Sequence, residues 1–155
     1  MLNNAVIKPL LLYMAVAVLA VMITLLSRTF AQEVPLVIHL DEAKWTPPGG
    51  GNGFPVGVRT MTLGVDSESG GVTYYALFPA ESHFDLHWHT HNEYVAVLSG
   101  SVNLVLGPES HSLSAGSYIV IPGGVNHAWD VPEDSDVVIL VRRSGPADFH
   151  FVSEN

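Results

Sequence analysis

Four side chains in this sequence have the types and spacing of a metal site, namely three imidazoles and one carboxylate. His87, His89 and Glu93 lie within one short stretch, and His127 follows the Pro-Gly-Gly of residues 122–124. Neutral imidazole nitrogens and carboxylate oxygens are common ligands of first-row transition metals. If these side chains converge in the fold, one bound ion would determine most of the chemistry available to the chain.

The local sequence predicts how these side chains could approach one another. Residues two apart on a β-strand point to the same face, so His87 and His89 should share a face. We expect residues 90–92 to form a three-residue hairpin turn, which would place Glu93 on the returning strand, nearly opposite His89. His127 is expected to begin a strand of a separate hairpin, which could face the first pair across the interior of a closed or sandwiched sheet.

Short β-strands are the elements that would position these ligands. Runs rich in Val, Ile and aromatic residues are separated by Gly, Pro and Ser at regular spacing, and no segment after residue 31 shows a helical apolar period. This pattern predicts an all-β fold, either an antiparallel sandwich or a barrel. The predicted strands cover residues 58–65, 72–78, 84–89, 93–98, 102–106, 118–121, 127–131, 137–141 and 148–152.

Two features precede this β-rich region. Residues 36–40 could form a short edge strand, and the Pro- and Gly-rich residues 47–53 form the strongest break in the chain after the N-terminal segment. Too few residues precede this break to form a domain of their own. We therefore predict an N-terminal arm over residues 32–53 and a single β-barrel domain over residues 54–155.

The first 31 residues have the features of an export signal. A short leader with one lysine is followed by an uninterrupted apolar run over residues 9–26, and Ala31 supplies a small residue for cleavage. We predict a signal peptide over residues 1–31, with an uncleaved anchor as the alternative, because a helix of that run reaches about 27 Å. Either outcome predicts a secreted or periplasmic protein that meets the membrane only through this segment.

Composition excludes several classes of function. The 155-residue chain contains no cysteine, which excludes disulfides, thiolate metal ligands and a cysteine nucleophile. It has 6 Lys and Arg against 15 Asp and Glu, and a formal net charge of −9 makes nucleic acid an unfavourable partner. No serine lies in a nucleophile elbow, so the sequence identifies no catalytic residue. The expected partner is therefore a small molecule.

The four ligands lie in two patterns that resemble the two cupin motifs. Glu81 stands where the first motif usually begins with glycine, and Val131 stands where the second usually closes with asparagine. Residues 41–48 and 145–152 are similar to the flanks of small exported single-domain cupins of unassigned activity. The matching patterns are His87-x-His89-x3-Glu93-x6-Gly100 and Gly116-x5-Pro122-x-Gly124-x2-His127, separated by residues 101–115.

This resemblance implies a double-stranded β-helix, the jelly-roll barrel of cupins. It also implies one divalent transition metal ion near one mouth of the barrel, held by His87, His89, Glu93 and His127. Three histidines and a carboxylate suit Fe, Mn, Co, Ni, Cu and Zn alike, so the ligand types do not identify the ion. Cupin barrels commonly pair through edge strands, which implies a homodimer.

Three further side chains are candidates for the wall of a substrate pocket. Trp129 lies two residues after His127, so it should share the inward face beside the ion, although the same position suits core packing. His83 has the same parity as His87 and would line the cavity if the strand extends that far back. Tyr75 lies on a predicted strand and is the third candidate for this wall, and Tyr74 and Phe149 are further candidates for it.

Three functions are compatible with this sequence. A metalloenzyme would use the positions that the protein ligands leave open on the ion, for oxygen insertion with Fe or Cu or for Lewis-acid chemistry with Zn, Mn or Ni. A non-catalytic module would use the same pocket to bind a small molecule or to hold a metal. A structural barrel within a larger complex is the third function, and fold alone decides among none of them.

Overall fold

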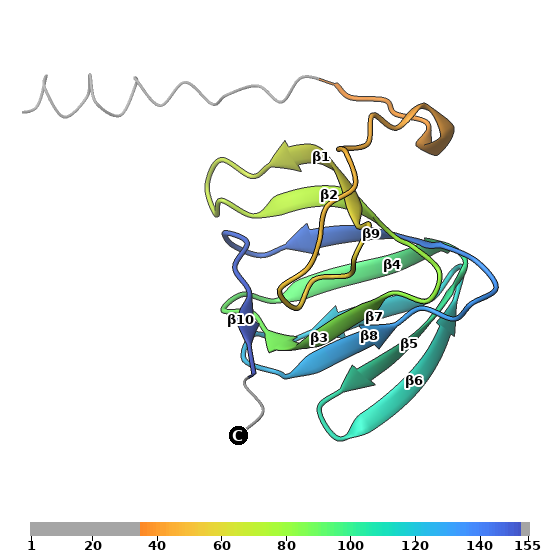
Figure 1. Cartoon of the computed structure of the whole chain (residues 1–155). Helices are drawn as coiled ribbons and strands as arrows, with labels where there is room; N and C mark the ends of the chain where they lie inside the picture. Colours follow the sequence, from red (N-terminus) through yellow and green to blue (C-terminus); the bar gives the residue numbers. More distant parts are fainter. Residues whose placement is uncertain (1–34, 153–155) are drawn as a thin grey trace, which may run out of the picture. The chain divides into compact units, whose positions relative to one another are not determined.

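Two antiparallel sheets of five strands each form the β-domain in the computed structural model, which describes residues 35–152 (Figure 1). The strands are Arg59–Val65 (β1), Val72–Phe78 (β2), His83–Trp88 (β3), Glu93–Ser99 (β4), Ser101–Leu106 (β5), Glu109–Ser114 (β6), Tyr118–Ile121 (β7), His127–Asp130 (β8), Val137–Arg143 (β9) and His150–Phe151 (β10). The first sheet has the order β1-β2-β9-β4-β7, and the second has the order β10-β3-β8-β5-β6. The predicted all-β class is confirmed.

Most predicted strands agree with the structure within two residues at either end. The strand β6 was not predicted, because its sequence is polar and none of its residues is buried at the edge of the second sheet. The predicted strand over residues 36–40 is wrong. Leu36 and Val37 are exposed, so no burial favours a strand there, and the 3-10 helix η1 (Leu40–Glu42) follows instead.

The predicted signal segment, residues 1–31, lies outside the described residues. Between residues 35 and 152, no helix is long and apolar enough to cross a membrane. The boundary between the arm and the β-domain, placed at residues 53 and 54, stays a prediction.

The chain crosses between the sheets at both predicted hairpins, which corrects the expected strand pairing. The strands β3 and β4 belong to different sheets, so residues 90–92 connect two sheets and do not form a hairpin. Both edges of β4 are already paired, one with β7 and the other with β9. Residues 122–126 likewise link β7 of the first sheet to β8 of the second. A link of this length can form a hairpin within one sheet or carry the chain to the other sheet. The hydrogen-bonded partners of the flanking strands determine which of the two forms.

Apolar side chains from both sheets fill the space between them. In β4, Glu93, Val95 and Val97 are buried, whereas the residues between them are less buried, as the two-residue period of a strand requires. Phe78 of the first sheet and Phe84 of the second pack edge to face, with ring centroids 5.9 Å apart. The buried core consists of Ala76, Phe78, Phe84, Val95, Val97, Val102, Leu104, Ile119, Ile121, Trp129, Val131, Val137, Ile139 and Val141.

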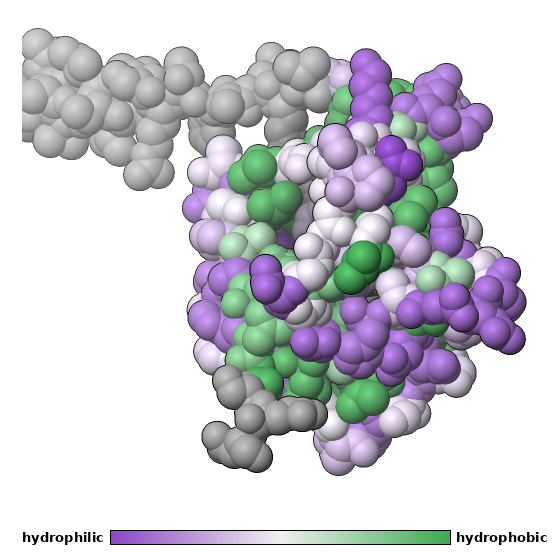
Figure 2. Space-filling model, viewed as in Figure 1, coloured by the Kyte–Doolittle hydropathy of each residue, from purple (hydrophilic) through white to green (hydrophobic). Residues whose placement is uncertain are grey.

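The outer surface of the described residues mixes hydrophilic and apolar side chains, as the face in Figure 2 shows. Tyr118 and Val120 of β7 are exposed by 66% and 45%, and β7 is an edge strand of the first sheet. Scattered apolar exposure is ordinary for a folded protein, but an exposed strand edge offers unpaired backbone groups to another chain.

All three glycines of the motif patterns, Gly100, Gly116 and Gly124, have a left-handed backbone. Gly100 has a φ of 74° and connects β4 to β5, where the chain passes from the first sheet to the second. A Cβ placed there would lie 2.2 Å from the carbonyl oxygen of Asp136. Gly116 has a φ of 90°, but a Cβ there would meet no atom within 4 Å. Only Gly100 is therefore required by close packing as well as by conformation.

Replacing Gly100 with Ala should destabilise the domain more than replacing Gly116 with Ala. Both substitutions put an L-residue into the left-handed region, at about 1–2 kcal/mol each. Only Gly100→Ala also forces a methyl group against the backbone at Asp136. Urea unfolding followed by tryptophan fluorescence would compare the free energies of unfolding. Equal losses for the two variants would contradict the role of this close contact.

Candidate metal centre

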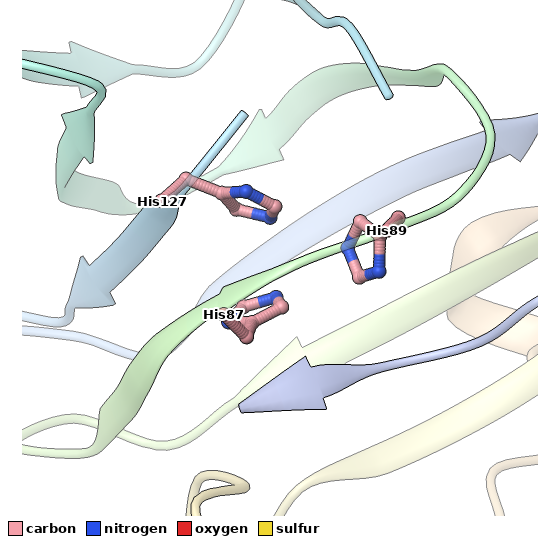
Figure 3. Close-up of side chains that lie close together, drawn as sticks. All are labelled: His87, His89 and His127. Carbon is pink, nitrogen blue, oxygen red and sulfur yellow. The ribbon is translucent and has the colours of Figure 1, made fainter. Parts of the chain in front are cut away.

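Three buried histidines form a cluster between the two sheets (Figure 3). One ligand nitrogen from each of His87, His89 and His127 lies within 4.8 Å of the others. His87 belongs to β3, His89 follows the end of β3, and His127 begins β8. His87 and His127 are direct partners in the β3–β8 ladder, so they are neighbours within one sheet. The expectation that His127 faces the other histidines across the interior is wrong, because β3 and β8 pair with each other.

Glu93 reaches this cluster from the opposite sheet. It is the first residue of β4, and its Oε2 lies 3.2 Å from Nε2 of His89 and 3.6 Å from Nε2 of His127. The side chain is buried, and it also lines the cavity described below. The four residues singled out in the sequence are therefore brought together, with three from the second sheet or its end and one from the first.

Backbone carbonyls set the orientation of all three imidazole rings. The Nδ1 of His87 lies 2.6 Å from the carbonyl oxygen of Asp85, and that of His127 lies 3.0 Å from the carbonyl oxygen of Val125. The Nδ1 of His89 is 2.6 Å from the carbonyl oxygen of Asp148. A carbonyl oxygen only accepts hydrogen bonds, so each Nδ1 carries a proton, and Nε2 is the atom at which a neutral ring would offer its lone pair to a cation.

The three Nε2 atoms are buried and have no hydrogen-bond partner. Burial lowers the pKa of His87 to about 3, and repulsion from His127 adds to this effect, so His87 is neutral near pH 7. Unpartnered lone pairs that face a buried carboxylate are costly, and a cation among them would satisfy all of them. The donor set thus fits a divalent transition metal, and the four residues that would hold it are those named above.

Two further groups act on Glu93: Arg143, which sequence reasoning missed, and Tyr74, which it placed only in the wall of the pocket. Arg143 is the ladder partner of Glu93 on β9, and its Nη2 lies 3.4 Å from Glu93 Oε1. Burial of Glu93 raises its pKa, whereas the charge of Arg143 lowers it. The hydroxyl of Tyr74 lies 3.5 Å from Arg143 Nη2, and burial together with the Glu93 charge raises the pKa of Tyr74 to about 12. The alternation of buried residues along β9 could have identified Arg143 as inward-facing.

The C-terminal segment holds His89 in place. His89 lies beyond the end of β3, and the carbonyl of Asp148 receives its Nδ1 proton. The carboxylate of Asp148 accepts a hydrogen bond from the backbone N–H of Thr90 at 3.0 Å and lies 3.1 Å from Nε2 of His150. The ring of His150 stacks on Trp88 with centroids 4.0 Å apart. Within the cluster, His89 is the histidine that lies outside a strand ladder, and this segment fixes its position.

A cavity of about 300 Å³ opens beside the cluster. His87 and Glu93 form part of its wall, so an ion bound by them would border the cavity. The rest of the wall is mostly apolar and includes several aromatic rings. It comprises Phe54, Pro55, Val58, Thr60, Thr62, Val72, Tyr74, Ala76, Phe78, Phe84, Trp129, Ile139, Ala147 and Phe149.

The three predicted pocket residues lie in different places. Trp129 is in the cavity wall. His83 lies on the surface, with its Nδ1 2.6 Å from Asp130 Oδ1, because an irregularity in the β3–β8 register breaks the parity between it and His87. Tyr75 points away from the cavity wall that Tyr74 forms, since neighbours on a strand face opposite sides.

Comparisons with known proteins agree with this architecture. Residues 74–142 match the protein family described as Cupin domain. The chain is 18% identical to the polyketide cyclase RemF from Streptomyces resistomycificus, with a TM-score of 0.61 over 79% of this chain and 88% of that one. It is 16% identical to a cupin-2 domain from Rhodospirillum rubrum, with a TM-score of 0.63 over 82% and 86% of the two chains.

A cupin 2 conserved barrel domain protein from Rhodopseudomonas palustris is similar to a comparable degree. It has 13% identity and a TM-score of 0.63 over 78% of this chain and 87% of that one. No curated protein matches the sequence. At these identities the likeness concerns the fold. The chain therefore has the all-β fold of these cupin structures, with a buried three-histidine cluster suited to a metal ion.

Proposed function

We propose that this protein binds one divalent transition metal ion through His87, His89, Glu93 and His127 and presents it to a small molecule in the adjoining cavity. One observation carries the proposal: three buried Nε2 lone pairs without a partner converge beside a buried carboxylate. The donor set does not select among Fe, Mn, Co, Ni, Cu and Zn. When bound, such an ion supplies Lewis-acid chemistry or, for Fe and Cu, oxygen chemistry.

The residues of the chain itself would bind and shield the small molecule. The aromatic side chains of Phe84, Trp129 and Phe149 give the cavity an apolar wall beside the ligand residues. Apolar burial favours an organic molecule over water in such a space, at about 25 cal/mol for each Å² removed from water. The proposed enzyme class is a small-molecule metalloenzyme, of either the oxygenase or the Lewis-acid type.

A non-catalytic binding module is the second candidate, and the composition of the cavity wall favours it. Among the described wall residues, the titratable groups are His87, Glu93 and Tyr74. The first two are proposed metal ligands, and the pKa of Tyr74 is raised to about 12 by burial and the Glu93 charge. The wall thus offers no free general acid or base that is poised near neutral pH. Binding without turnover is compatible with this arrangement.

Removal of a proposed ligand should abolish tight metal binding. Substitution of residues that only orient metal ligands typically lowers affinity about 10–100-fold, so loss of a ligand itself should exceed this range. We expect titration calorimetry of the full chain with Zn²⁺ to give one site per chain, and His127→Ala to weaken it by more than about 100-fold. The control His111→Ala changes a partly exposed histidine on β6 and should bind as the original protein does. Unchanged Zn²⁺ affinity in His127→Ala would refute the proposed site.

Oxygen consumption separates the enzyme from the binding module. The iron-loaded protein would be mixed with aromatic or diketone substrates in air, and dissolved oxygen would be followed with an electrode. Uptake that persists in His111→Ala and disappears in His127→Ala is the result expected of an oxygenase. A substrate that binds tightly without consuming oxygen or forming product favours the module.

The cellular setting is also a proposal. The apolar run over residues 9–26 supports export, and the exposed edge strand β7 supports a homodimer. Native mass spectrometry of protein recovered from outside the cytoplasm reports both properties. We expect two copies of a chain that begins at Gln32. A full-length chain would instead favour the uncleaved anchor, and a monomer would end the dimer proposal.

A further inference from the structure

The buried charges around the histidine cluster do not balance once an ion is bound. Arg143 and Glu93 are both buried, carry opposite charges and lie 3.4 Å apart, so they cancel each other. The three histidines would add no charge as ligands, because an ion held at Nε2 requires a neutral ring with its one proton at Nδ1, which faces a carbonyl oxygen in each case. A divalent cation would therefore leave two uncompensated positive charges in the interior, and the charge of the ion must be included in any such balance.

Other described carboxylates near the cluster do not remove this excess. Asp148 approaches His89 with its backbone carbonyl, while its carboxylate contacts Thr90 and His150. Asp85 likewise offers His87 its carbonyl oxygen, and its side chain is 59% exposed beside His83. Exposed carboxylates are screened by water and contribute little to the interior.

Arg143 adds an unusual feature to this positive interior. Its Nε and Nη1 atoms are buried without a hydrogen-bond partner, although Nη2 reaches Glu93 and Tyr74. The guanidinium carbon lies 5.0 Å from the centroid of Phe149, a ring that lines the cavity. Arg143 therefore stands directly behind the cavity wall.

The wall of the cavity favours a ligand that is largely apolar. Its volume of about 300 Å³ is at the lower end of small-molecule sites. Rings from both sheets and from the terminal segments form the wall, and its polar members other than His87 and Glu93 are two threonines and Tyr74. Aromatic side chains of this kind favour a flat hydrocarbon group. An inorganic anion alone would leave this apolar surface in contact with water.

We propose that the ligand of this cavity is a small amphipathic monoanion, with a carboxylate, enolate or phenolate head directed at the metal centre and a flat apolar body against the aromatic wall. This inference rests on the metal binding proposed above and names the ligand class for that site. The head would compensate part of the positive charge that the ion adds to the balanced pair of Glu93 and Arg143. The body would occupy the apolar space beside Phe84, Trp129 and Phe149.

Three probes with one ring and different heads test the proposal directly. Benzoate is an anion, benzamide is neutral and benzylamine is a cation at pH 7. Titration calorimetry of the Zn²⁺-loaded full chain should give benzoate an affinity at least about tenfold above that of benzamide, with benzylamine the weakest. The reason is the Coulomb attraction between a carboxylate and the positive charge that the ion adds to the interior. Removal of Zn²⁺ with a chelator should bring the benzoate and benzamide affinities close together, since Glu93 and Arg143 then cancel.

A pair of neighbouring arginines supplies the matched variants. Arg143→Gln removes a buried charge behind the wall, whereas Arg142→Gln changes the exposed residue before it on β9. We expect Arg143→Gln to lower the ratio of benzoate to benzamide affinity several-fold and Arg142→Gln to leave it unchanged. Circular dichroism reports whether Arg143→Gln folds. If it does not fold, the comparison of Zn²⁺-loaded and metal-free protein still decides the question.

The outcomes separate this inference from the proposed function. If Zn²⁺ binds and benzamide equals or exceeds benzoate, the ligand class is wrong and the metal site stands. If Zn²⁺ binds and none of the three probes does, the ligand class is again refuted. If the chain binds no divalent transition metal, the proposed function fails, and the inference that rests on it fails with it.

Discussion

Three backbone carbonyls fix the direction of three imidazole rings, and the rest of the site depends on this constraint. Because each Nδ1 donates to a carbonyl, each Nε2 lone pair is turned inward, toward the other two and toward Glu93. Such a group of acceptors is unfavourable when buried and empty of cations. A positive ion bound among these acceptors would relieve this unfavourable arrangement.

The two-sheet architecture explains how a small domain brings these groups together. Strand pairing puts His87 beside His127 within one sheet, and packing of the other sheet brings Glu93 against them. Arg143 reaches the same point because it pairs with Glu93 across the β4–β9 ladder. The site therefore lies where two independent kinds of contact meet, hydrogen-bonded register within sheets and side-chain packing between them.

The sequence predicted the fold class, most strand positions and the convergence of the four ligand candidates, because periodicity and residue type are local properties. It did not predict that β3 and β4 belong to different sheets. A short link between two strands can form a hairpin within one sheet or carry the chain from one sheet to the other. The register irregularity in β3, which moves His83 to the surface, also depends on the partner strand. The backbone of Glu81 could not be predicted from its residue type. It adopts a φ of 62°, a left-handed geometry that glycine would take without strain.

The contact between His89 and Asp148 has a consequence for the order in which the molecule assembles. The two residues are 59 positions apart, and the contact forms only when the final strand, β10, reaches β3. Such a contact carries the entropic cost of closing a long loop, in contrast to the pairing of neighbouring strands such as β5 and β6. The full orientation of the three imidazole rings therefore requires the C-terminal segment, and a chain whose synthesis has not reached Asp148 lacks the carbonyl that orients His89.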